Sequence, residues 1–187
     1  MRKAIIYDTI FRDVLRSFSV QQNQRTNMTV ASIPPSGLSH SDTAKTGLMQ
    51  GKKGLVMGVA NDRSIGWGIA AAAAGQGAEL AFTYQGDALK KRVNPLAESV
   101  SSDIVLPCDV TDEVSVDLVF NTLKEKWGKL DFLVHAIAYS DKEELKGGYV
   151  DTTRENFQNT MEISVYSFTA LARRAAEMMP DGGSLLT

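Results

Sequence analysis

The sequence predicts an α/β fold in which a parallel β-sheet is covered by helices on both faces. From about residue 51 onward, short apolar runs alternate with segments of helical character. Such alternation implies parallel strands joined by right-handed crossovers. The 187 residues, 43% of them hydrophobic and 22% charged, suffice for one domain with a substantial core. We therefore expect a doubly wound sheet with strand order 3-2-1-4-5.

The expected strands are short and mostly apolar. The first, Gly54 to Gly58, is a continuous apolar run closed by glycine, which is typical of a strand buried on both faces. The last reaches the end of the sequence at Thr187, so we expect an incomplete sheet whose later strands lie beyond this residue. The five expected strands are residues 54–58, 79–84, 103–107, 131–136 and 184–187.

Four helices are expected between these strands. The first is small and apolar, which favours close packing on a sheet, and the second contains Pro95, which is expected to kink or split it. Gly128 ends the third, and residues 152–155 offer a capping box for the long fourth helix. The expected helices are residues 64–75, 87–100, 111–127 and 152–179. The expected inner face of the third comprises Val114, Leu118, Phe120, Leu123 and Trp127.

The N-terminal stretch differs in charge from the rest of the chain. Residues 1–46 hold six basic and three acidic side chains, whereas the remainder is acidic overall. One interpretation is a basic, amphipathic transit peptide, although its aspartates count against this. The other is a flexible upstream extension or a misassigned start, with Met28 or Met49 as the true beginning. In both interpretations the α/β fold is expected to occupy residues 47–187.

The overall composition argues against several kinds of partner. A net charge of −2 gives no reason to expect nucleic acid or an anionic membrane. No apolar run approaches the roughly 20 residues needed to cross a bilayer. The single cysteine, Cys108, rules out an internal disulfide and fits a reducing compartment. We expect no metal site.

A loop of glycines and small polar residues, from Gly58 to Gly68, joins the first strand to the first helix. This is the position at which an open parallel sheet binds a dinucleotide. Glycine lets the backbone approach a pyrophosphate, and the first N–H groups of the helix point toward it with a favourable dipole. Ser64 can add a hydroxyl donor and also cap the helix. Because Gly58 precedes Gly66 by eight residues, the spacing departs from G-x-G-x-x-G, and a purely structural turn is the alternative.

Polar residues also follow the second and third strands. Gln85 lies where a carboxylate would bind a ribose 2′-hydroxyl and an arginine a 2′-phosphate. An uncharged glutamine favours NAD over NADP, although the basic residues 90–92 weaken this preference. Asp109 and Val110 follow the third strand, where they can contact an adenine ring, and helix capping by Asp109 or its neighbour is the alternative.

The fourth strand ends in small side chains. Ala136, Ile137 and Ala138 leave room for a cofactor to lie across them. His135 precedes them, and we expect it to be a buried packing residue rather than a catalytic one.

Five motifs follow one another along the chain in a recognisable order. They are residues 58–65 (GVANDRSI), 79–85 (ELAFTYQ), 108–110 (CDV), 135–139 (HAIAY) and 163–168 (ISVYSF). Together they resemble the NADH-dependent enoyl-[acyl-carrier-protein] reductases of bacterial fatty-acid synthesis, which are divergent Rossmann-fold members of the short-chain dehydrogenase/reductase superfamily. Ordinary members would carry T-G-x-x-x-G-x-G and N-N-A-G at two of these places, and this chain carries neither.

The resemblance implies a set of cofactor-binding residues and one substrate-binding residue. From the pyrophosphate through the adenosine to the nicotinamide of NADH, the cofactor residues are Gly58, Ser64 and Ile65, then Gln85, Asp109 and Val110, then Ile137 and Ile163. The substrate residue is Ser140, which falls where the family's main chain meets the acyl substrate.

By the same resemblance, the reaction is hydride transfer from NADH to the β-carbon of a trans-2-enoyl thioester. Negative charge develops on the thioester oxygen, where a tyrosine hydroxyl stabilises it, and a lysine holds the cofactor ribose. This Tyr-x6-Lys pair is expected beyond Thr187, so no catalytic residue is assigned, and Tyr139, Tyr149 and Tyr166 are not taken as substitutes. The chain as given is therefore expected to be inactive.

The resemblance also implies partners and a location. We expect an enoyl-acyl-carrier-protein substrate, a homotetramer formed partly through the long helix between Thr153 and Met179, and a bacterial cytoplasmic enzyme. An organelle matrix is the alternative if residues 1–46 are a transit peptide. Two other functions stay open, namely another short-chain dehydrogenase/reductase and a module that binds NAD without chemistry.

Overall fold

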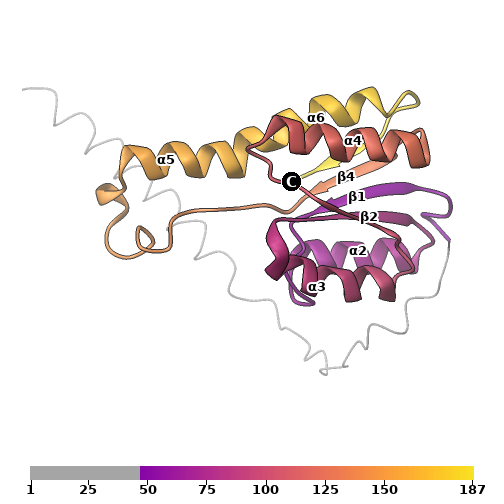
Figure 1. Cartoon of the computed structure of the whole chain (residues 1–187), viewed down its shortest axis with the longest axis horizontal. Coiled ribbons are helices and arrows are strands. Elements are labelled where there is room, and N and C mark those ends of the chain that lie inside the picture. Colours follow the sequence, from indigo (N-terminus) through magenta and orange to yellow (C-terminus); the bar gives the residue numbers. More distant parts are fainter. Residues whose placement is uncertain (1–46) are drawn as a thin grey trace, which may run out of the picture. The chain divides into compact units, whose positions relative to one another are not determined.

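The computed structural model describes residues 47–187, which form a five-stranded parallel sheet of order β3-β2-β1-β4-β5 (Figure 1). The prediction of a doubly wound parallel sheet with this order is confirmed. The expectations for residues 1–46 lie outside the described residues. The strands are β1 (Lys53–Met57), β2 (Glu79–Tyr84), β3 (Ile104–Pro107), β4 (Phe132–His135) and β5 (Ser184–Leu186).

Helices cover both faces of the sheet (Figure 1). On one face lie α2 (Ile65–Gly75) and α3 (Gly86–Ser99), and on the other lie α4 (Glu113–Trp127) and α6 (Ser167–Glu177). Because side chains alternate along a strand, β1 contributes to both cores. Its Leu55 and Met57 pack toward α4 and α6, whereas Val56 packs toward α2 and α3. None of the helices in residues 47–187 is long and apolar enough to cross a bilayer.

Two predictions for the helices are wrong in part. Pro95 does not split α3, which continues through this residue, and Val93 and Ala97 on either side are fully buried against the sheet. In α4, Val114 and Leu118 are exposed, whereas Phe120 and Leu123 are buried as expected and Trp127 packs against the core. The buried stripe also includes two residues that the prediction left out, Val116 and Val119. It comprises Val116, Val119, Phe120 and Leu123.

The long helix after β4 is one continuous helical path with a change of pitch. It begins with α5 (Arg154–Met161), passes through a π-helical turn, η2 (Glu162–Tyr166), and continues as α6. The predicted capping box is displaced by one residue, since the hydroxyl of Thr153 accepts the hydrogen bond from Asn156 N–H at 3.1 Å. Glu144, from the preceding loop, accepts from Thr153 N–H and Oγ1–H at 2.9 and 2.6 Å. The loop residue thus takes the part expected of Glu155.

At the amino ends of the strands, Asp131 ties β1 to β4. Its carboxylate accepts from Lys53 N–H at 2.9 Å and from the ammonium of Lys52 at 3.0 Å. Burial of the side chain, which is 12% exposed, opposes ionisation. The hydrogen bonds from Lys53 and Lys52 and the charge of Lys129 outweigh this burial, so the pKa of Asp131 lies below its ordinary value.

Candidate functional site

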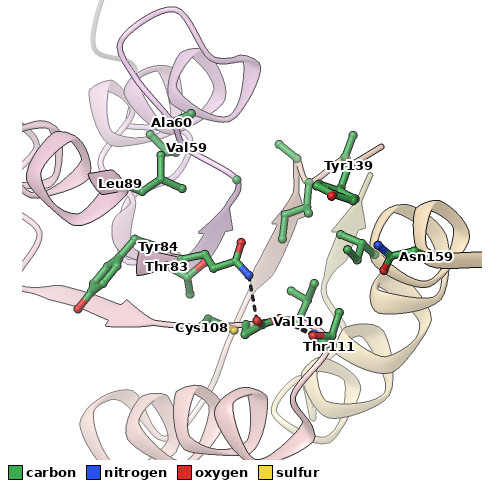
Figure 2. Close-up of a pocket in the computed structure, with 17 residues that line it drawn as sticks. Val59, Ala60, Thr83, Tyr84, Leu89, Cys108, Val110, Thr111, Tyr139 and Asn159 are labelled. Atoms are coloured by element: carbon green, nitrogen blue, oxygen red, sulfur yellow. Dashed lines mark hydrogen bonds between the residues drawn. The ribbon is translucent and has the colours of Figure 1, made fainter. Parts of the chain in front are cut away.

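A cavity of about 510 Å³ opens at the carboxyl ends of β1 to β4 (Figure 2). It lies where the chain, having built β1, β2 and β3 in one direction, crosses back to place β4 on the other side of β1. Open parallel sheets bind ligands at this reversal. The volume falls within the roughly 300–1,000 Å³ of small-molecule pockets. It is therefore the candidate binding site.

The cavity gathers most of the predicted site residues. Those that line it come from the ends of four strands and from the π-helical turn, namely Gly58, Gln85, Asp109, Val110, Ile137 and Ile163. Ser64, Ile65 and Ser140 are not among its lining residues. Ser64 and Ile65 stand at the start of α2, and Ile65 is exposed.

Gly58 is where the backbone of the β1 exit touches the β4 exit. A Cβ at this residue would lie 2.1 Å from the carbonyl oxygen of Ala136, and the φ of +91° is one that L side chains rarely adopt. Only glycine fits here without displacing main chain. The absence of a side chain also leaves the cavity open along this edge.

The side chain of Ser64 braces the loop instead of capping the helix. Although Ser64 is the N-cap residue of α2, its hydroxyl makes no cap hydrogen bond. Its Oγ accepts from the N–H groups of Ala60 and Asn61, both at 3.1 Å, and donates to the Asn61 carbonyl. The prediction that this side chain caps the helix is wrong, because the loop turns its own N–H groups toward the hydroxyl. The role of Ser64 toward a pyrophosphate stays a prediction.

Gln85 and Asp109, which follow the neighbouring strands β2 and β3, both line the cavity and contact each other. Gln85 Nε2–H donates to Asp109 Oδ2 at 2.9 Å. Asp109 Oδ1 accepts from Thr111 N–H at 2.9 Å and from its hydroxyl at 2.7 Å. The backbone hydrogen bond from Thr111, followed by the one from its hydroxyl, lowers the pKa of Asp109. The cavity therefore contains a fixed, ionised acceptor.

Neither Asp109 nor Thr111 caps the following helix, so that alternative is wrong. The N-cap of α4 is Asp112, whose carboxylate accepts from Val114 N–H at 3.0 Å. The basic residues near Gln85 are exposed on α3, and Lys90 Nζ lies 5.8 Å from the ring centroid of Tyr84. This distance is within the range of a cation–π contact.

His135 is buried in β4, at 2% exposure, as predicted, and is not among the residues that line the cavity. Its Nε2 lies 2.8 Å from Ser167 Oγ, whose single proton is donated to the Ile163 carbonyl at 2.6 Å. Nε2 must therefore carry the proton, and Nδ1 accepts from Thr187 Oγ1–H at 3.1 Å. Burial lowers the pKa of His135, which fits this neutral tautomer.

Two tyrosine–lysine pairs match the Tyr-x6-Lys spacing in the sequence, Tyr84 with Lys91 and Tyr139 with Lys146. Both tyrosines line the cavity, but neither lysine does. Lys146 Nζ instead lies 2.6 Å from Glu143 Oε2 in an exposed loop. Neither pair is assembled as a tyrosine and a lysine facing one ligand.

Several lining residues were not predicted. Thr83, Tyr84 and Cys108 stand at strand ends, and the convergence of these ends at one sheet edge was a signal that could have identified them. Burial raises the pKa of the Cys108 thiol to about 11, although a hydrogen bond with Ser115 acts in the opposite direction. The thiol therefore stays protonated near neutral pH and serves as a packing residue, not as a nucleophile. The other unpredicted residues are Val59, Ala60, Leu89, Thr111, Tyr139 and Asn159.

Comparison with known proteins gives consistent matches. A sequence model of the family described as Enoyl-(Acyl carrier protein) reductase matches residues 58–187. Enoyl-[acyl-carrier-protein] reductase [NADH] 2 of Rhizobium meliloti (strain 1021) is 67% identical over 141 residues, which cover 75% of this chain and 53% of that protein. Enoyl-[acyl-carrier-protein] reductase [NADH] FabI of Rickettsia felis is 54% identical over 142 residues, 76% of this chain and 55% of that protein.

Solved structures agree with the sequence matches. The Anaplasma phagocytophilum reductase in complex with NAD has 57% identity and a TM-score of 0.72, covering 74% of this chain and 54% of that one. The Bacillus cereus enoyl-acyl carrier protein reductase with NADP+ and indole naphthyridinone has 44% identity and a TM-score of 0.73, covering 75% and 55%. The chain thus spans about half the length of the relatives it matches. Since the family match covers more than half of the sequence and includes the whole cavity, this chain belongs to the enoyl-(acyl carrier protein) reductase family.

Proposed function

We propose that residues 47–187 form the NADH-binding part of an enoyl-[acyl-carrier-protein] reductase. The proposed reaction is hydride transfer to the β-carbon of a trans-2-enoyl thioester carried on acyl carrier protein. One observation carries the proposal: the cavity at the sheet reversal is lined by six of the eight residues that the family resemblance assigns to NADH. The cytoplasm is the proposed compartment, supported by a sequence with a single, buried cysteine.

The residues present fit a dinucleotide. Gly58 lets the backbone of the loop approach a diphosphate, and the N-terminus of α2 adds a favourable dipole there. Asp109 offers an ionised acceptor for an adenine amino group, with Val110 against the ring. Ile137 and Ile163 form an apolar wall at the proposed nicotinamide end. When bound there, the nicotinamide supplies the hydride.

The Gln85–Asp109 contact supports NADH over NADPH. Because Gln85 Nε2–H is held by the Asp109 carboxylate, a 2′-phosphate beside Gln85 would face a negative charge. A ribose hydroxyl carries no such penalty. The relatives make the question concrete, since one solved structure contains NAD and another contains NADP+.

Fluorescence titration with NADH and NADPH tests this preference, and we expect NADH to bind more tightly. Gln85→Arg should then shift the ratio of the two dissociation constants toward NADPH by about tenfold, as expected for one charge-assisted hydrogen bond. Gln158→Arg adds the same charge on the exposed surface of α5 and should leave the ratio unchanged. Equal or tighter NADPH binding by the parent protein would overturn the interpretation of Gln85.

The proposed activity is measured as enoyl-thioester-dependent oxidation of NADH by the protein that carries this chain at the full length of its relatives. A donor must stabilise the developing charge on the thioester oxygen. We assign no catalytic residue within residues 47–187. Tight NADH binding without oxidation would favour the non-catalytic NAD-binding module instead.

The proposed homotetramer is supported by an apolar stripe on the long helix. Phe157, Met161 and Val165 recur every four residues along α5 and η2 and are each 40–50% exposed. Side chains at this spacing lie on one helix face. An apolar stripe of this kind is suited to packing against a second copy of the chain, and sedimentation equilibrium gives the mass that tests it.

A further inference from the structure

A second, polar stripe runs along the same helix on a different face. Asn156, Thr160 and Ser164 also recur every four residues, and all three are hydrogen bonded to the segment that leaves β4. The successive partners run backward along the chain, so helix and segment run antiparallel. In Figure 1 this segment extends beside α5, past the edge of the sheet.

The segment depends on these side chains for its position. Residues 136–141 belong to no strand or helix. Two of their backbone N–H groups donate to helix side chains, that of Tyr139 to Ser164 Oγ at 3.0 Å and that of Asp141 to Asn156 Oδ1 at 2.9 Å. No strand or helix supplies acceptors for these N–H groups, so the helix side chains hold this main chain in place.

Asn156 makes the most constrained of these contacts. The residue is 8% exposed, and both ends of its amide are engaged, with Oδ1 accepting from Asp141 N–H and Nδ2–H donating to Ser140 Oγ at 3.2 Å. Thr160 Oγ1 lies 3.3 Å from the same Ser140 hydroxyl. The backbone N–H of Asn156 donates to Thr153 Oγ1, so both the backbone and the side-chain amide of Asn156 are held in place.

We propose that Asn156 is a positioning residue for the acyl substrate. It holds the main chain of Asp141 and the hydroxyl of Ser140, directly after Tyr139, which lines the cavity. This inference rests on the proposed function, in which Ser140 marks the acyl end of the site. Asn156 itself is not among the lining residues, so it acts through the main chain of the segment and not by touching the ligand.

The test is steady-state kinetics of Asn156→Ala with a trans-2-enoyl thioester, together with a separate NADH titration, in the protein at the full length of its relatives. Loss of the acceptor for Asp141 N–H should raise KM for the thioester by up to about tenfold, the effect of one lost hydrogen bond. The dissociation constant of NADH should stay within about twofold, because the nucleotide residues belong to other strand ends. Gln158→Ala, which removes an exposed amide from the same helix, should change neither value.

Asn156→Asp keeps the acceptor and gives the rescue variant. Its carboxylate can accept from Asp141 N–H and from the hydroxyls of Ser140 and Thr160, near the favourable N-terminus of α5. We expect KM within about threefold of the parent value for this variant, and restored protection of the Asp141 amide from hydrogen exchange. The Asn156→Asp variant also allows the proposal to be tested if Asn156→Ala does not fold.

The outcomes separate the two proposals. A parent protein that binds NADH but reduces no enoyl thioester contradicts the proposed function. An active parent with an unchanged KM in Asn156→Ala, or with KM and the NADH dissociation constant rising together, overturns the positioning role. If only Asn156→Asp folds and its KM rises as much as tenfold while the Asp141 amide stays protected, the role is overturned as well.

Discussion

Replacing Gly58 by alanine tests how the proposed phosphate loop is built. The added Cβ would lie 2.1 Å from the carbonyl oxygen of Ala136 and 2.5 Å from its carbonyl carbon. Both are main-chain atoms, so rotation of a side chain cannot make room, and the φ of +91° is itself unfavourable for alanine. Backbone strain of this kind costs roughly 1–3 kcal/mol. If the loop relaxes by moving away from its binding geometry, the affinity falls by about 5- to 150-fold.

The assay is an NADH titration of Gly58→Ala by fluorescence, with thermal unfolding measured on the same samples. We expect the dissociation constant to rise at least about fivefold and Tm to fall. Gly68→Ala is the matched control, because a Cβ there meets nothing within 4 Å. This exposed helical position should gain about 0.5–1 kcal/mol of stability and keep its NADH affinity. Unchanged affinity and unchanged Tm in Gly58→Ala would refute the reasoning.

Three further predictions concern other parts of the fold. Ser64→Ala should weaken NADH binding by about 1 kcal/mol, because its hydroxyl braces the loop, and an unchanged dissociation constant would show that the brace is dispensable. Asp131 has a lowered folded pKa, so its carboxylate stabilises the fold above the unfolded pKa of about 3.9, and this stability is lost as pH falls through the folded value. Urea unfolding should therefore give Asp131→Asn a lower free energy of unfolding than the parent at neutral pH and a smaller decrease of that free energy in acid. Parallel plots of the free energy of unfolding against pH for the two proteins would contradict this. The Cys108 thiol, with a pKa of about 11, should resist aromatic disulfides near neutral pH until the protein is unfolded, and rapid labelling of the native protein would contradict its burial.

The strand order was predictable because it depends on local pattern and general chain topology. Apolar runs identify buried strands, and right-handed crossovers then restrict their order. The second strand, expected at residues 79–84, has these same bounds in the structure. The inner face of α4 was not predictable in the same way. Val114 and Leu118 fit the apolar periodicity of the helix but are exposed, so periodicity alone could not separate them from the buried Phe120 and Leu123.

In the candidate site, the sequence predicted correctly those residues whose place in the cavity follows from their position at the end of a strand. Gln85 and Asp109 follow successive strands, and the carboxyl ends of parallel strands meet at one edge. Sequence reasoning failed where a side chain turns toward a distant partner. The cap at Thr153 depends on Glu144, nine residues earlier, and the hydroxyl of Ser64 depends on the path of its loop. Leu89 and Asn159 reach the cavity from helices, through packing that no local motif encodes.

The small residues Gly58, Gly66 and Ala136 contact one another, so the size of each is restricted by the other two. Gly58 touches the main chain of Ala136, and a Cβ at Gly66 would lie 3.3 Å from the Cβ of Ala136, tighter than most real contacts. The β1 exit, the first turn of α2 and the β4 exit thus meet at a single alanine. Enlarging Ala136 would push the start of α2 away from the loop and carry its N–H groups with it. The geometry of the proposed diphosphate site is therefore determined as much by a residue at the end of β4 as by the glycine loop itself.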